Sequence, residues 1–120
     1  MSIIQAFADR GAQCVIGFNN PASFHELDIF QNRFTSAILD VDVTLNEKYT
    51  PVGERLHFAD ACLSAVTTFN EANADQSNVS SSTSTLTASD GTQLTMVVFS
   101  INNVNRVTII GDNIYAKIPE

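Results

Sequence analysis

Two cysteines and two histidines are the side chains of this sequence that could support nucleophilic catalysis: Cys14, Cys62, His25 and His57. A cysteine nucleophile needs an imidazole within hydrogen-bond reach at an accessible position. Cys14 opens an apolar run, so we expect a small buried side chain there. His57 and Cys62 are separated by about 140° on a helix and would not share a face. The pattern therefore predicts no catalytic residue.

Metal ligands and phosphate-binding loops are equally sparse. His57 and Asp60 have a helical i,i+3 spacing, but no second cluster supplies the further ligands that zinc requires. Asp40 and Asp42 come nearest to a calcium loop, yet the D-x-D-x-D-G pattern is missing and alternating carboxylates more often face water. A Gly-rich phosphate motif and a Gly-x-Ser-x-Gly elbow are also missing. We predict no metal site and no cofactor.

One loop is placed where a ligand could bind. In open α/β sheets, ligands gather beyond the carboxyl ends of parallel strands. Here that position falls between Phe18, at the end of an apolar run, and the N-terminus of a helix. Asn19, Asn20 and Ser23 are therefore the candidate ligand-binding residues, for a small anion or a peptide. The alternative is a plain strand-to-helix turn that Ser23 caps.

Two segments with the apolar spacing of amphipathic helices must position these residues. The first runs from Phe24 to about Leu39 and opens with a capping box, in which Ser23 is the N-cap and Glu26 follows three residues later. The second is expected to begin at Pro51, because proline is favoured at the first helical position. Its predicted buried stripe consists of Leu56, Ala59, Leu63, Val66 and Phe69.

The remaining segments predict strands. The apolar run Cys14–Phe18 indicates an interior strand of parallel type, because both of its faces are apolar. Residues 71–84 are rich in Ser, Asn and Asp and are expected to form a flexible loop. Beyond them Asp90-Gly91 predicts a β-hairpin, and strands are expected at Val107–Ile110 and Ile114–Ile118. The expected fold class is α/β or α+β: a mixed sheet with one buried parallel-type strand, two long helices and a C-terminal hairpin or meander.

Length, composition and charge narrow the function classes. The chain has 120 residues, of which 44% are hydrophobic, and a net charge of −7. These values favour a single domain over residues 1–120 and exclude a largely disordered chain. Apolar stretches are too short for a membrane span, and six Lys and Arg residues are too few for a nucleic-acid partner. Two cysteines cannot form a disulfide-stapled framework.

One stretch of the sequence carries a family resemblance. The run from Ile3 to Phe18 contains Gly11-Ala12 and ends in Val15-Ile16-Gly17-Phe18, so that a helix leads through a Gly-Ala pair into a buried strand. Together with the spaced aromatic residues Phe30 and Phe34 and the late Gly111-Asp112 turn, this run resembles caspase-like bacterial domains of clan CD, the gingipain and CHAT type. In that family the catalytic His and Cys precede the helix at which this sequence begins, so no catalytic position is carried over.

The resemblance implies the C-terminal half of a caspase-like domain without its catalytic machinery. We therefore expect a non-catalytic module with a structural or binding role. The alternatives are a peptidase-related cysteine hydrolase and a small-ligand sensor. Expected partners are a second copy of the chain, covering an exposed sheet edge, or the missing upstream half-domain. A cytoplasmic location is expected if the chain is complete, and a cell-surface or secreted one if it belongs to a longer precursor.

Overall fold

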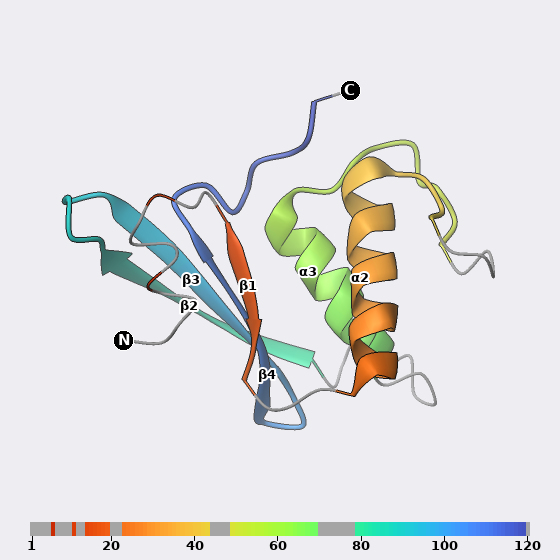
Figure 1. Cartoon of the computed structure of the whole chain (residues 1–120), viewed down its shortest axis with the longest axis horizontal. Helices are drawn as coiled ribbons and strands as arrows, with labels where there is room; N and C mark the ends of the chain where they lie inside the picture. Colours follow the sequence, from red (N-terminus) through yellow and green to blue (C-terminus); the bar gives the residue numbers. More distant parts are fainter. Residues whose placement is uncertain are drawn as a thin grey trace. The chain divides into compact units, whose positions relative to one another are not determined.

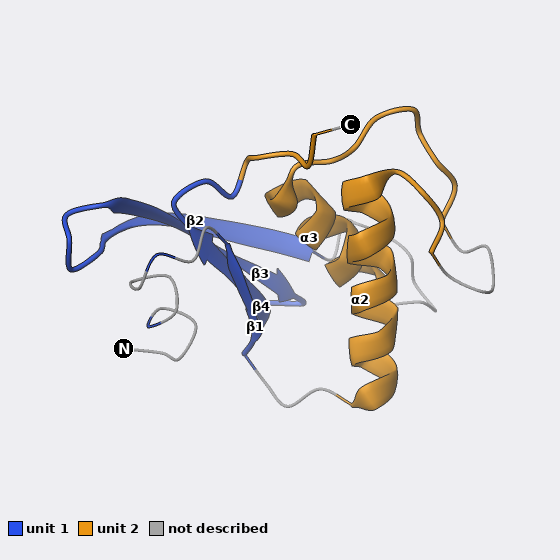
Figure 2. Ribbon diagram, turned by 45° about the horizontal axis from the view of Figure 1, so that its top comes forward, with its two compact units in different colours: residues 1–21, 78–114 blue, residues 22–77, 115–120 orange. Residues whose placement is uncertain are grey.

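The computed structural model describes residues 6, 11, 14–19, 23–43, 49–69 and 79–119. Its elements, in chain order, are β1 (Val15–Phe18), α2 (Phe24–Leu39), α3 (Phe58–Thr67), β2 (Val79–Thr87), β3 (Gln93–Ile101) and β4 (Val104–Gly111) (Figure 1). They fall into two compact units, one of residues 1–21 and 78–114 and one of residues 22–77 and 115–120 (Figure 2). The first unit contains the sheet and the second the two helices, which confirms the predicted α+β class.

The sheet has the strand order β1-β4-β3-β2, and every pair of neighbours is antiparallel. One row of the register joins Val15, Ile110, Met96 and Ser84 across all four strands. The two central strands carry the buried apolar side chains. Ile110 and Leu94 belong to one face, while the neighbouring positions on the other face include Val97, Phe99, Val107 and Ile109.

The expected parallel-type interior strand is wrong. The run before Phe18 forms β1, which lies at an edge of the sheet, pairs antiparallel with β4 and is only half-buried. The strands buried on both faces are β3 and β4 instead. A short apolar run predicts that its side chains contact apolar groups, but it does not predict where the strand lies in the sheet. An edge strand can also contact apolar groups on both of its faces.

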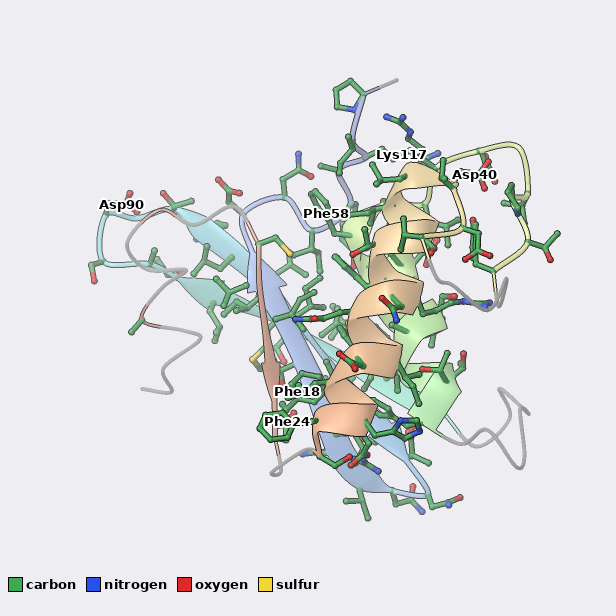
Figure 3. All side chains as sticks on the ribbon, turned by 45° about the vertical axis from the view of Figure 1, so that its right-hand side comes forward. Phe18, Phe24, Asp40, Phe58, Asp90 and Lys117 are labelled. Carbon is green, nitrogen blue, oxygen red and sulfur yellow. The ribbon has the colours of Figure 1, made fainter. Side chains whose placement is uncertain are left out.

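Two turns set the antiparallel meander, and the first of them is the hairpin turn that Asp90-Gly91 predicts. At the β2–β3 hairpin the Ala88 N–H donates to the Thr92 carbonyl (2.8 Å), and Gly91 adopts a positive φ of 90°. The Asp90 side chain, at the tip of the hairpin, accepts a hydrogen bond from the Thr92 N–H (2.9 Å) (Figure 3). Asn102 and Asn103 form the next turn with φ values of 51° and 67°, a conformation that asparagine tolerates better than most residues.

The first predicted helix is confirmed to the residue. Ser23 is the N-cap of α2, its hydroxyl accepts a hydrogen bond from the Glu26 N–H, and the Glu26 carboxylate accepts one from the Ser23 N–H. This reciprocal pair satisfies donors that the first turn of a helix leaves without intrahelical partners. Asp40 ends the helix in the left-handed conformation, with a φ of 55°.

The second helix begins later in the sequence than predicted. α3 starts at Phe58 rather than near Pro51. Gly53 has a φ of 94°, which no right-handed helix contains, and its N–H donates to the Asp40 carboxylate instead of entering a helical ladder. The Leu56 N–H donates to the carbonyl of Ala37 on α2. These tertiary hydrogen bonds outweigh the local preference for proline at a helix start.

Two further expectations need correction. The loop predicted over 71–84 is too long, because β2 already begins at Val79; residues 71–78 lie outside the described residues. Thr83 and Thr85 favour an extended backbone, and the hairpin pairs the whole segment with β3. The expected strand Ile114–Ile118 is absent, since Ile114 and Tyr115 form a turn. The Ala116 carbonyl accepts from the N–H of Phe58, next to α3, rather than from a sheet.

Candidate functional site

Asn19, the first candidate ligand-binding residue, extends the pairing of β1 with β4. Its N–H donates to the Arg106 carbonyl (2.9 Å), and its side-chain oxygen accepts from the hydroxyl of Thr108 (2.9 Å). Thr108 is 4% exposed. The amide of Asn19 thus satisfies a buried hydroxyl, and this contact gives the residue a structural role at the end of β1.

Ser23 and Asn20, the other two candidates, differ in what the structure shows. Asn20 lies outside the described residues. Ser23 is exposed, and both its hydroxyl and its N–H are engaged with Glu26 in the capping box. Asn19 belongs to the first compact unit and Ser23 to the second. Each described candidate therefore serves its own unit, and a ligand at this loop stays a prediction.

The two cysteines differ in how deeply they are buried. Cys14 is half-buried just before β1, and burial raises the pKa of its thiol to about 11. Cys62 is fully buried on α3. A thiolate is the nucleophilic form of cysteine, so a raised pKa lowers reactivity at neutral pH. Cys14 therefore has a weakly reactive thiol, and Cys62 is closed off from solvent.

The histidines have distinct local roles. His57 is the N-cap of α3, where Nδ1 accepts from the Asp60 N–H (3.1 Å) and Nε2 lies 3.0 Å from the Asp60 carboxylate. Its ring also meets that of Tyr115 edge to face, with 5.3 Å between centroids. His25 is exposed in the first turn of α2. The predicted His57–Asp60 pair is thus present, and it forms a helix cap.

Among the described residues of the helical unit, a polar cluster surrounds Asp40 (Figure 3), and sequence reasoning missed this cluster. Its carboxylate accepts hydrogen bonds from the Tyr49 hydroxyl (2.8 Å) and from the N–H groups of Val52 (2.8 Å) and Gly53 (2.9 Å). The bond from Val52, followed by that from Tyr49, lowers the pKa of Asp40. The stabilisation from this group is therefore present above its unfolded pKa of about 3.8 and is lost as the pH falls through the folded pKa.

Tyr49 is the buried side of the same cluster. It is 6% exposed, and the guanidinium of Arg33 lies 5.3 Å from its ring centroid. Burial, together with the hydrogen bond to Asp40, raises the pKa of Tyr49 to about 12. The cluster ties the loop after α2 to the helix itself. No Gly follows Asp40 to mark this cap in the sequence, and the Tyr49 contact needs the tertiary fold.

Neither a metal centre nor a membrane span emerges from the described part of the chain. Within it, the His, Cys, Asp and Glu side chains do not gather in groups of three or more that could hold a metal ion. No helix among these residues combines the length and the hydropathy needed to cross a bilayer.

The two edges of the sheet remain as candidate binding elements. β1 exposes one long side of four apolar or small residues, and β2 exposes one long side of nine mostly hydroxyl-bearing residues. Among the described residues, no strand pairs with the outer side of either one. A strand from another polypeptide could pair with such an edge through main-chain hydrogen bonds.

Comparison of the chain with models of known protein families, with curated proteins and with solved structures found no match.

Proposed function

We propose that this chain is a non-catalytic module of caspase-like type that acts by binding, and that β1 is where it receives the upstream half of such a domain. The proposal rests on the sequence resemblance around Val15–Phe18 and on one structural observation: β1 is an edge strand. Among the described residues, the sheet places only β4 beside β1.

The chemistry of β1 supports a protein partner. Val15 and Ile16 are apolar and point to opposite faces of the sheet, yet both are only half-buried. Asn19 donates to Arg106 across the β1–β4 ladder, so alternation along the strand turns the N–H and C=O of Ile16 away from β4. An incoming strand would bond to these groups and cover the apolar side chains.

The surroundings of the cysteines and histidines support a role without catalysis. Burial raises the pKa of the Cys14 thiol to about 11, Cys62 is fully buried, and His57 caps α3 through Asp60. The fold thus uses these side chains for packing and capping.

Co-expression tests this proposal. The polypeptide encoded directly upstream of Met1 is produced as a separate tagged chain together with this one. We expect the two to co-purify, and we expect Ile16→Pro to reduce the captured amount at least about tenfold, because proline removes the outward N–H without breaking a bond to β4. Ile16→Val keeps the N–H and is the matched control. A stop codon directly upstream, or co-purification that Ile16→Pro leaves unchanged, contradicts the proposal.

A further inference from the structure

We propose that the β2 edge pairs with the β2 edge of a second copy of this chain, antiparallel and about a two-fold axis at Thr83. This inference concerns the opposite side of the sheet from β1 and does not depend on the proposed function. The observations that carry it are the length, the continuity and the charge of β2, together with the direction of its backbone groups.

The β2 edge lacks the features that usually protect an edge strand. It pairs with β3 without interruption from Val79 to Thr87, whereas the irregularity in this sheet lies between β3 and β4. The strand contains neither proline nor any charged residue, and the next carboxylate along the chain is Asp90. Natural proteins guard long edges with lysine, proline, bulges or short length. A long, uninterrupted and uncharged edge of this kind is suited to pairing.

The direction of the backbone groups follows from the hairpin. Ala88 donates to Thr92 and therefore occupies a hydrogen-bonded position opposite β3. Because such positions alternate in an antiparallel ladder, the odd-numbered residues of β2 turn their N–H and C=O groups away from β3. These residues are Val79, Ser81, Thr83, Thr85 and Thr87. They form a regular row of donors and acceptors along the outer edge.

One antiparallel register pairs all five of these outward residues with the same residues of a second copy. Antiparallel pairing about Thr83 places Ser81 opposite Thr85 of the second copy and Val79 opposite its Thr87, so every outward residue meets another outward residue. On the face that these residues share, the paired side chains are hydroxyl-bearing or β-branched, and such cross-strand pairs are favourable. Ser81, Thr83 and Thr85 are exposed, so pairing displaces no packed side chain.

The distribution of charge permits pairing at the β2 edge, although the net charge of the chain opposes association. Each copy carries a net charge of −7, which opposes association in general. The uncharged stretch from Val79 to Ser89 lets two copies meet without bringing like charges into direct contact. The remaining repulsion acts over distance and is screened by salt. Association should therefore strengthen as the salt concentration rises.

Sedimentation of the full chain over a range of concentrations tests the pairing. We expect a reversible dimer of modest affinity, since pairing through one strand buries little area, and tighter association at higher salt. Thr83→Pro removes an outward N–H and keeps the β2–β3 ladder, and it should raise the dimer dissociation constant at least about tenfold. Thr83→Val, which keeps the N–H, should leave the dimer intact. Circular dichroism checks that each variant is folded.

Cysteine cross-linking tests the register. Residues in a hydrogen-bonded antiparallel pair have Cα atoms about 5.5 Å apart, within the range of a disulfide. Thr83→Cys should therefore form a covalent dimer with oxidised glutathione, whereas Thr87→Cys, which faces Val79 of the second copy, should not. A chain that stays monomeric at all concentrations and salt levels, or equal cross-linking of the two variants, overturns the proposal. Loss of the Thr83 dimer alone leaves binding of an upstream segment at β1 untouched, so the two proposals fail separately.

Discussion

The two edges of the sheet are built from different residues, and the difference separates two kinds of surface. β1 is short and apolar, with Val15 and Ile16 half-buried on opposite faces. β2 is more than twice as long, and its residues from Ser80 to Thr83 are all exposed. An apolar edge is costly to leave in water, so β1 suits permanent cover. A hydroxyl-rich edge is already solvated, so β2 suits reversible pairing.

The two strands next to these edges are similar in burial. β4 stands next to β1 and β3 next to β2, and both are buried on both faces. The central strands therefore contribute most of the stability of the sheet, and the residues of the two edges can differ without destabilising the fold. Substitutions in the centre and at the edges should separate these contributions.

The largest loss of stability is expected when a buried side chain at the centre of the sheet is truncated. Ile110 is fully buried and lies between Val15 and Met96 in the register, so Ile110→Ala should cost about 2–5 kcal/mol in the free energy of unfolding. Leu94, opposite Leu86 of β2, is the matched site on the other side, and Leu94→Ala should cost a similar amount. Urea unfolding measures both. A loss below about 0.5 kcal/mol in either would show that this strand is not central to stability.

The second effect concerns the thiol next to β1. With a pKa of about 11, Cys14 should react with iodoacetamide at pH 8 roughly 100-fold more slowly than an unperturbed cysteine. Because the folded pKa lies above the unfolded one, the stability that the neutral thiol contributes is complete below about pH 9 and is lost as the pH rises toward 11.

Mass spectrometry of the labelled chain, with Cys62 as the fully buried comparison, measures the rate at each thiol. Unfolding the protein in urea should accelerate both reactions. Rapid labelling of Cys14 in the folded protein would contradict a desolvated thiol and would favour the cysteine-hydrolase alternative.

A third prediction compares the two edges directly. Ile16→Ala removes half-buried apolar surface from β1 and should cost about 1–2 kcal/mol. Thr83→Ala at the corresponding row of β2 removes only an exposed side chain and should change stability by less than about 0.5 kcal/mol. Thermal unfolding at low protein concentration, where dimers do not contribute, provides the measurement. Equal losses would remove the distinction between the edges.

The smallest effect is expected at the turn that forms the β2 edge. Gly91 has a φ of 90°, and no atom lies within 4 Å of where a Cβ would stand, so Gly91→Ala should cost about 1 kcal/mol through the backbone alone. Gly91→Asn should cost less, because asparagine tolerates this conformation better than alanine. Unfolding titrations of the two variants test this order, and an equal cost for both would point to side-chain crowding instead.

Local patterns predicted the elements whose causes lie within a few residues. The capping box of Ser23 and Glu26 placed the start of α2, and Asp90-Gly91 placed the hairpin. The second helix shows the limit of such patterns. Pro51 is a favourable helix start, but Asp40, which precedes it by a whole loop, takes the N–H groups of Val52 and Gly53. A distant carboxylate decided this boundary, and no local window contains it.

The candidate site divides in the same way. The sequence by itself determined which residues have polar side chains near the end of β1, as well as the hydroxyl content of β2 and the low charge of that strand. Only the tertiary structure decided that Asn19 bonds to Thr108, that β1 pairs antiparallel with β4, and that β2 is an edge. The physical reason is that side-chain chemistry is local, whereas strand order depends on which distant segments bury one another.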